Sequence, residues 1–104
     1  MNIQFNTDKN IEGSERLTEY FSTTINKELS RFDSHITRLD VHLSDENSNK
    51  DGQNEKRCKL EAKLEGMQPI AVTNNADSIE QAVKGATDKL KASLDTVIGK
   101  LRNH

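Results

Sequence analysis

The sequence predicts an α+β fold in which a four-stranded sheet carries two helices on one face, in the order β-α-β-β-β-α. Two stretches have apolar residues every three or four positions, which is typical of amphipathic helices. Four others alternate apolar and polar residues or are short and apolar, as strands do. A chain of 104 residues has room for one modest core, so we expect a single domain spanning residues 1–104.

The first strand and the first helix come from the N-terminal third. Residues 2–6 form the first expected strand, because Ile3 and Phe5 alternate with polar neighbours. Gly13 and Ser14 then offer a break and a hydroxyl cap. The apolar residues that follow at helical spacing are Leu17, Phe21, Ile25, Leu29 and Phe32. They predict an amphipathic helix of about five turns that ends near Phe32.

Three further strands are expected in the middle of the chain. From His35 the spacing of the apolar residues changes from three or four residues to two. One face should hold Thr37, Leu39, Val41 and Leu43, and the other Ile36, Arg38, Asp40 and His42. Residues 45–55 contain no apolar side chain and predict a mobile loop that reverses the chain.

Residues 56–65 alternate again, with Cys58, Leu60, Ala62 and Leu64 inward, so this strand should pair antiparallel with the previous one. A turn begins at Gly66, and residues 69–73 form a short fourth strand with Pro69 near its start. The pairing direction of the first strand stays open at this point.

The last quarter of the chain predicts a long helix. Asp77 and Glu80 form a capping-box pattern in which Asp77 caps the amides and Glu80 reaches back. One apolar stripe follows, made of Ile79, Val83, Ala86, Leu90, Leu94, Val97 and Leu101. Gly85 and Gly99 each weaken such a helix by about 1 kcal/mol relative to Ala.

Composition limits the cellular setting and the chemistry. Cys58 is the only cysteine, no basic segment leads into an apolar one at the N-terminus, and no apolar run approaches the roughly 20 residues of a membrane span. We therefore expect a cytoplasmic chain without membrane attachment.

The sequence shows no catalytic or metal-binding constellation. Cys58 points inward, and His35, His42 and His104 are scattered, so neither a nucleophile with its base nor a zinc site is indicated. We expect no enzyme activity, metal or cofactor.

The net charge of −2 is divided unevenly along the chain. Residues 1–55 hold 6 Lys and Arg against 11 Asp and Glu, and residues 56–104 hold 9 against 6, so the halves carry −5 and +3. A basic half is compatible with an anionic partner or with an ordinary solvated surface. The third strand carries Arg57, Lys59 and Lys63 outward, and the last helix carries Lys84, Lys89, Lys91, Lys100 and Arg102. Such cations could neutralise RNA phosphates. Base stacking is not expected, because all three Phe residues are assigned to the core and only Tyr20 lies near the surface.

The element order, the length and several short segments together resemble one protein family. The segments are Met1-Asn2-Ile3, Glu28-Leu29-Ser30-Arg31-Phe32, and the last helix with Asp77-Ser78-Ile79, Ala82-Val83 and Asp88-Lys89-Leu90. Over nearly its whole length the chain resembles the ribosome hibernation-promoting factor and ribosome-associated inhibitor family, also called the sigma-54 modulation protein family.

This resemblance implies a fold similar to the double-stranded-RNA-binding domain. It also implies binding to the small ribosomal subunit and its rRNA near the decoding region, which inhibits translation during stress or stationary phase. No membrane or small-molecule substrate is implied, and we expect a monomer away from the ribosome. The chain ends after the last helix and so resembles the short form, without the C-terminal domain through which long forms pair ribosomes.

Site residues carry over only in part. Lys89 and Arg31 match positions that are usually or often basic in the family, and Lys27, Lys91 and the third-strand cations could add to them. At four positions this chain departs from the residue that family members commonly have. Glu28 and Thr96 stand where Lys is common, Ala92 where Arg is usual, and Ile79 where an aromatic residue is common. Fewer phosphate contacts predict weaker or differently placed RNA binding. The alternative is a protein-interaction or stress-regulatory module with the same fold and no ribosome binding, as the acidic first half suggests.

Overall fold

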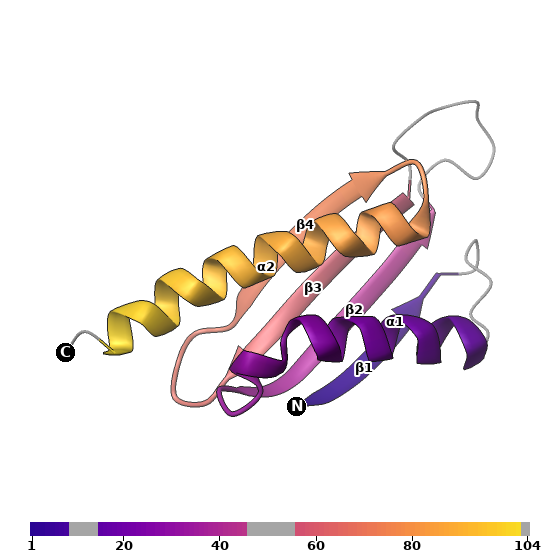
Figure 1. Cartoon of the computed structure of the whole chain (residues 1–104). Helices are drawn as coiled ribbons and strands as arrows, with labels where there is room; N and C mark the ends of the chain where they lie inside the picture. The colour runs from indigo at the N-terminus through magenta and orange to yellow at the C-terminus, as the bar shows by residue number, and fades with distance from the viewer. Residues whose placement is uncertain (9–14, 46–55, 103–104) are drawn as a thin grey trace.

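A computed structural model describes residues 1–8, 15–45 and 56–102 (Figure 1). In chain order its elements are β1 (Asn2–Thr7), α1 (Glu15–Glu28), the 3-10 turn η1 (Ser30–Phe32), β2 (Ile36–Asp45), β3 (Lys56–Leu64), β4 (Ile70–Ala76) and α2 (Ile79–Arg102). The α+β class and the order of elements are thus confirmed. The predicted break at residues 13–14, most of the predicted loop at 45–55, His104 and the side chains of Leu101 and Arg102 lie outside the described residues.

The strands form one sheet in the order β1-β2-β3-β4. β1 runs parallel to β2, with Phe5 opposite Val41, and this settles the direction that the sequence left open. A parallel pair needs a crossover, and α1 supplies it. β3 is antiparallel to both neighbours, with Leu60 between Val41 and Val72. The predicted pairing of the second and third strands is confirmed.

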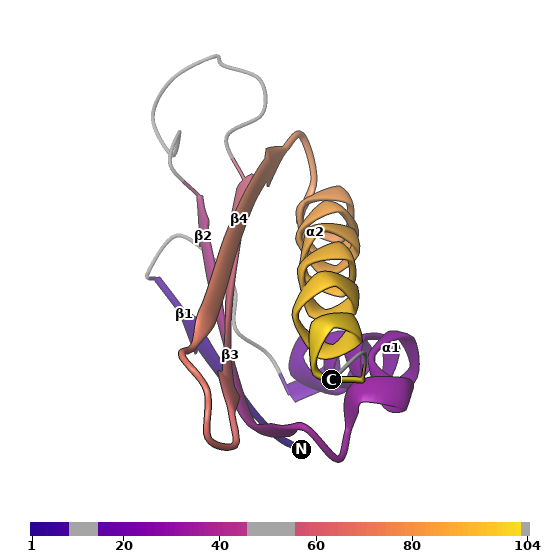
Figure 2. The ribbon, with the colours of Figure 1, turned by 90° about the vertical axis from the view of Figure 1, so that its left-hand side faces the viewer.

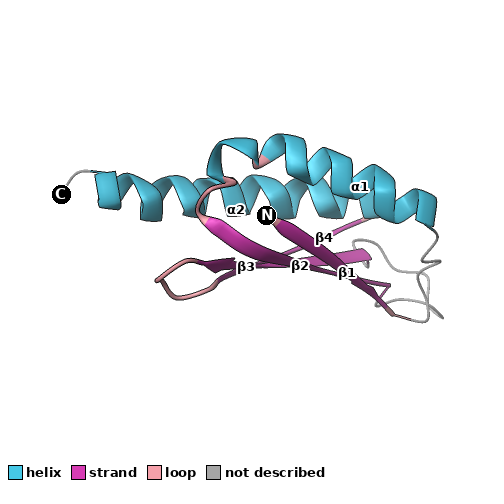
Figure 3. Ribbon diagram, turned by 90° about the horizontal axis from the view of Figure 1, so that it is seen from below, coloured by secondary structure: helices cyan, strands magenta, loops and turns pink. Residues whose placement is uncertain are grey.

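Both helices cover the same face of the sheet, as Figures 2 and 3 show. The two helices run parallel to each other. The first half of α1 contacts the start of α2, and the end of α1 contacts the second half of α2. Tyr20 donates a hydrogen bond to Glu80 at 3.5 Å, and the Lys91 ammonium lies 3.6 Å from the Glu28 carboxylate. The predicted arrangement of two helices on one face is confirmed.

The core lies between the sheet and the helices. The residues that fill it come from α1 and η1 (Phe21, Ile25, Phe32), from the sheet (Leu39, Val41, Leu43, Cys58, Leu60, Ala62, Leu64) and from α2 (Ala82, Val83, Ala86, Leu90, Leu94, Ile98). Burying each large apolar side chain contributes roughly 1.5–3 kcal/mol. The prediction that the third strand points four residues inward is confirmed, because Cys58, Leu60, Ala62 and Leu64 are all buried.

The first helix is shorter than its apolar period indicated. α1 ends at Glu28, and Leu29 leaves the helical conformation with φ −103° and ψ 11°. The Phe32 amide then donates to the Leu29 carbonyl at 2.9 Å within the 3-10 turn. Such a turn places residues i and i+3 on the same side, so Leu29 and Phe32 both stay buried. The prediction of one helix of about five turns was wrong for this reason.

The alternation of β2 is broken near its start. The register with β3 shifts between Ile36 and Arg38, so Ile36 is buried and Thr37 is exposed. This is the reverse of the predicted faces for these two residues. An extra residue in one strand exchanges the faces on either side of it. From Arg38 onward Leu39, Val41 and Leu43 point inward as predicted.

The second helix begins one residue later than its capping pattern suggested. The Ser78 hydroxyl accepts a hydrogen bond from the Gln81 amide at 3.1 Å, and the Ser78 carbonyl accepts from the Ala82 amide at 2.9 Å. Ser78 is therefore the N-cap, where Asp77 was predicted. At the other end Ile98 is buried beside the predicted Val97, which is half-buried.

Gly85 allows α2 to approach β4 closely. A Cβ atom placed there would overlap the side-chain amide of Asn74, with the Asn74 Cγ atom only 2.6 Å away. Asn74 Nδ2 in turn donates to the Gln81 and Ala82 carbonyls at 3.4 and 3.3 Å. The glycine that weakens the helix by propensity therefore leaves the space that the Asn74 amide occupies between α2 and β4.

We predict that Gly85→Ala lowers the free energy of unfolding by about 1–3 kcal/mol, because the new methyl group overpacks against Asn74. Gly99→Ala is the matched control, since a Cβ there meets no atom within 4 Å, and should raise stability by up to about 1 kcal/mol. Denaturant unfolding measures both. In an Asn74→Ala background the cost of Gly85→Ala should vanish. Equal stabilisation by the two glycine substitutions would contradict the close approach.

Candidate nucleic-acid interface

The ten cations predicted to contact RNA fall on two opposite sides of the molecule. One set lies on the side covered by the helices. It comprises Lys27 in the last turn of α1, Arg31 in η1, and Lys84, Lys89, Lys91, Lys100 and the backbone of Arg102 in α2. Arg57, Lys59 and Lys63 alternate with the buried residues of β3 and therefore lie on the outer face of the sheet. The structure does not bring the two sets together.

Three of the predicted cations on the helical side are paired with carboxylates. Arg31 bonds Asp95 through both guanidinium nitrogens at 2.8 and 2.9 Å, and its guanidinium also lies 4.4 Å from the centre of the Phe32 ring. Lys91 pairs with Glu28 at 3.6 Å and Lys84 with Asp88 at 3.7 Å. Glu28 is thus not only a departure from the family pattern. It also offsets the charge of Lys91, which was expected to compensate for it.

The other predicted cations of the helical side whose side chains are described, Lys27, Lys89 and Lys100, form no ion pair with the described residues. Lys89 donates a hydrogen bond to the Thr73 carbonyl of β4 at 2.8 Å. Lys27 and Lys100 are exposed and make no ion pair or hydrogen bond with the part of the chain that the structure describes. Ala92 and Thr96 are also exposed, so these departures from the family pattern remove charge from the surface and leave the core unchanged.

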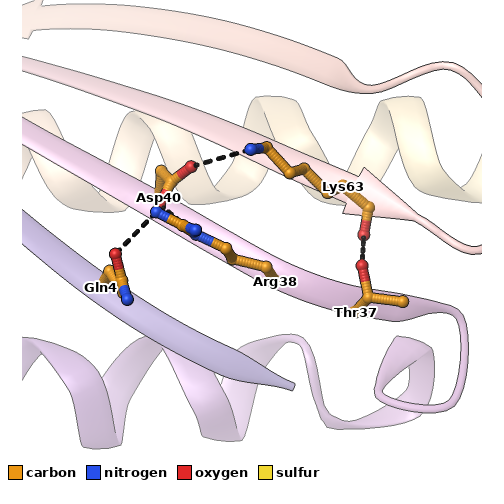
Figure 4. A network of polar contacts seen from close by, with 5 residues as sticks. All are labelled: Gln4, Thr37, Arg38, Asp40 and Lys63. Atoms are coloured by element: carbon orange, nitrogen blue, oxygen red, sulfur yellow. Dashed lines mark hydrogen bonds and ion pairs between the residues drawn. The ribbon is translucent and has the colours of Figure 1, made fainter.

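On the outer face of the sheet, a carboxylate is buried beneath two cations (Figure 4). The Asp40 side chain is only 7% exposed, and it lies 2.8 Å from Arg38 Nε and 3.9 Å from Lys63 Nζ. Arg38 also donates to the Gln4 side chain of β1 at 2.7 Å. The network therefore ties the three strands β1, β2 and β3 together on the side away from the helices.

Sequence reasoning placed Arg38 and Asp40 outward but did not count Arg38 among the RNA-binding cations. The missing information was the strand register, which sets Arg38 opposite Lys63 and Asp40 opposite Glu61. If β2 and β3 are known to pair antiparallel, two basic residues that face each other on neighbouring strands, such as Arg38 and Lys63, can be recognised as a cluster of positive charge.

The chemistry of the remaining polar groups is limited. Burial raises the pKa of the Cys58 thiol from 9.0 to about 12. Within residues 1–8, 15–45 and 56–102, no group of three or more His, Cys, Asp or Glu side chains is placed to hold a metal ion. None of the helices in this part of the chain has the length and apolar character required to cross a membrane.

Comparison with known proteins places the chain in a family. Residues 4–102 match the family described as Sigma 54 modulation protein / S30EA ribosomal protein. The chain belongs to this family. The match covers both helices and all but the first residues of the sheet, and it confirms the resemblance found in the sequence. No curated protein matches the chain significantly in sequence.

Two solved structures share the fold of this family member. The N-terminal domain of Protein Y from Thermus thermophilus superposes with a TM-score of 0.68 at 21% identity, over 93% of this chain and 99% of that one. A ribosomal subunit interface protein from Coxiella burnetii gives a TM-score of 0.72 at 20% identity, over 95% and 99% of the two chains. The likeness to a double-stranded-RNA-binding domain stays a prediction.

We predict that the Cys58 thiol makes folding sensitive to alkaline pH. Between pH 9.0 and about pH 12 the unfolded chain ionises this thiol and the folded chain does not, so the free energy of unfolding falls as pH rises. The slope from this group approaches about 1.4 kcal/mol per pH unit, and its stabilising effect is complete below pH 9.0. Unfolding curves of the wild-type chain and Cys58→Ala measure the difference in slope. Identical slopes would contradict the assignment.

We predict that Asp40→Ala lowers the free energy of unfolding by about 1–3 kcal/mol, because Arg38 and Lys63 lose the carboxylate between them. The loss is smaller than for a fully buried pair, since both cations stay partly solvated. Asp88→Ala removes an exposed carboxylate from the Lys84 pair and should change stability by less than about 1 kcal/mol. Denaturant unfolding compares the two variants, and equal effects would show that the network has no structural role.

Proposed function

We propose that this protein binds the small ribosomal subunit near its decoding region and holds the ribosome in an inactive state during stress or stationary phase. The observation that carries the proposal is the family match over residues 4–102. One of the two similar structures is described as a ribosomal subunit interface protein, in agreement with a ribosomal partner.

In this proposal the protein acts by occupying space. The molecule is elongated, with extents of 50, 25 and 19 Å along its principal axes, and this body would lie in the path that mRNA and tRNA otherwise use. No step of bond making or breaking is needed for such inhibition. The setting is the cytoplasm, where ribosomes work, and the protein would act as a monomer without a small-molecule substrate.

RNA phosphates are the proposed ligands of the cations on both sides of the molecule. The candidate contacts are Lys27, Arg31, Arg57, Lys59, Lys63, Lys84, Lys89, Lys91, Lys100 and Arg102. Exposed ion pairs such as Arg31 with Asp95 contribute only about 0–1 kcal/mol, so a phosphate could displace the carboxylate. Tyr20 is the one large apolar side chain of the described residues that is exposed, which favours backbone contacts over base stacking.

A second function is favoured by the charge pattern of the helices. Arg31, Lys84 and Lys91 each lie beside an exposed carboxylate, and such an alternating surface suits a protein partner better than a phosphate backbone. The protein would then be an interaction or stress-regulatory module that keeps the family fold without binding ribosomes.

We predict that the protein co-sediments with purified small ribosomal subunits at low salt and dissociates as salt increases, because each phosphate contact releases counterions. Added to a cell-free translation reaction, it should lower protein synthesis in proportion to the bound fraction. Sedimentation and translation yield are measured on the same preparations. Failure to co-sediment at low salt would rule out the ribosomal proposal and favour the protein-interaction module.

A further inference from the structure

The outer face of the sheet carries four exposed or half-exposed cations from two neighbouring strands. We define the basic sheet patch as Arg38 of β2 with Arg57, Lys59 and Lys63 of β3. The register sets Arg38 opposite Lys63, while Lys59 lies opposite His42. No element of the described chain covers this face, since both helices lie on the other side (Figure 3).

The two carboxylates that the described parts of β2 and β3 place among these cations, Asp40 and Glu61, are buried and half-buried. The side chain of Asp40 is 7% exposed, whereas those of Arg38 and Lys63 above it are 41% and 46% exposed. Glu61, opposite Asp40, is half-buried. A partner approaching the sheet therefore meets the cations first, and the field that it experiences is positive.

On the helical side both partners of each ion pair reach solvent, and the cations Arg31, Lys84 and Lys91 are 59%, 74% and 31% exposed. The carboxylates of Glu28, Asp95 and Asp88 are 44%, 50% and 56% exposed, so they stand in solvent beside the cations that they neutralise. A phosphate that binds Arg31 or Lys91 must approach one of these carboxylates. Among the described ion pairs, cations are accessible on both sides, but only on the helical side are their carboxylates accessible as well.

We propose that the basic sheet patch is the main RNA-contacting surface of this protein, and that it binds the phosphate backbone without reading sequence. Arg57 and Lys59 are two residues apart on one strand, so their Cα atoms are separated by about 7 Å. Arg38 and Lys63 are cross-strand neighbours separated by about 5 Å. The sheet holds these charges at fixed spacing. A backbone ligand also fits this surface, because no Phe, Tyr or Trp of the described strands lies on the outer face to stack on bases.

The identity of the RNA as rRNA of the small subunit rests on the proposed function, but the choice of face does not. The matched variants are Arg57→Glu with Lys59→Glu on the sheet and Lys84→Glu with Lys100→Glu on α2. Both pairs change the net charge equally and alter exposed side chains. Thermal unfolding of all chains checks that each variant folds, and Arg57→Lys with Lys59→Arg should retain binding.

Binding is measured to intact small subunits and to protein-free rRNA over a range of salt. We expect the sheet pair to weaken binding to both by about tenfold or more and to lower the salt slope by roughly 2, with a smaller effect of the helix pair. Unchanged binding by the sheet pair, or a larger loss with the helix pair, overturns the proposal. Loss on intact subunits without loss on protein-free rRNA also overturns it, and identifies an acidic ribosomal protein as the occupant.

The proposed function can fail separately. If the wild-type chain does not co-sediment with small subunits but binds protein-free rRNA through the sheet pair, the ribosomal role is wrong and the basic sheet patch stands. If the sheet pair behaves as the wild type while subunit binding persists, the ribosomal role stands and the patch is wrong.

Discussion

Two parallel helices must cover the single apolar face of a four-stranded sheet, and the other features of the structure follow from this constraint. The residues at the centre of the contact, such as Ile25, Leu60 and Leu90, are completely withdrawn from water. Since burial of apolar surface is the dominant stabilising contribution, each helix is held where its apolar stripe meets the sheet. For α2 this requires close approach to β4, where Gly85 leaves room for the Asn74 amide. The charged groups discussed above consequently lie on the helical side or on the outer face of the sheet.

The division of charge between these two sides carries the functional argument. Long side chains on neighbouring helices can reach one another, and Arg31 and Lys91 find carboxylates that remain in solvent. On a sheet the side chains stand upright and close together, so a short carboxylate such as Asp40 is covered by the longer cations beside it. The same kind of ion pair thus hides the negative partner on one side and displays it on the other. Family membership indicates a ribosomal partner, and this difference in exposure indicates which side meets it.

Periodicity in the sequence was sufficient to predict β1, β2, β3 and both helices, because each of these elements buries one face. β4 was predicted from a short apolar segment at residues 69–73, whereas the strand spans Ile70–Ala76. Periodicity failed where the backbone departs from a regular period. The irregularity before Arg38 exchanges the faces of Ile36 and Thr37, and the 3-10 turn keeps Phe32 buried after the helix has ended. For the candidate site, the sequence supplied the cations but not their neighbours. Arg31 and Asp95 are 64 residues apart in the chain, and no local pattern reveals that they meet. Only the register shows that Lys63 and Arg38 share one carboxylate.

The hydrogen bond from Lys89 to the Thr73 carbonyl has a consequence for solution behaviour. β4 is the last strand of the sheet, and an unpaired row of backbone groups on such a strand is a template for adding a strand from another molecule. Lys89 donates a hydrogen bond to one backbone acceptor of this strand, the Thr73 carbonyl. A second chain that docked at this carbonyl would have to displace or desolvate the Lys89 ammonium. A lysine that the sequence predicts to contact RNA therefore also satisfies a backbone carbonyl of the last strand, and its replacement would leave that acceptor without this partner.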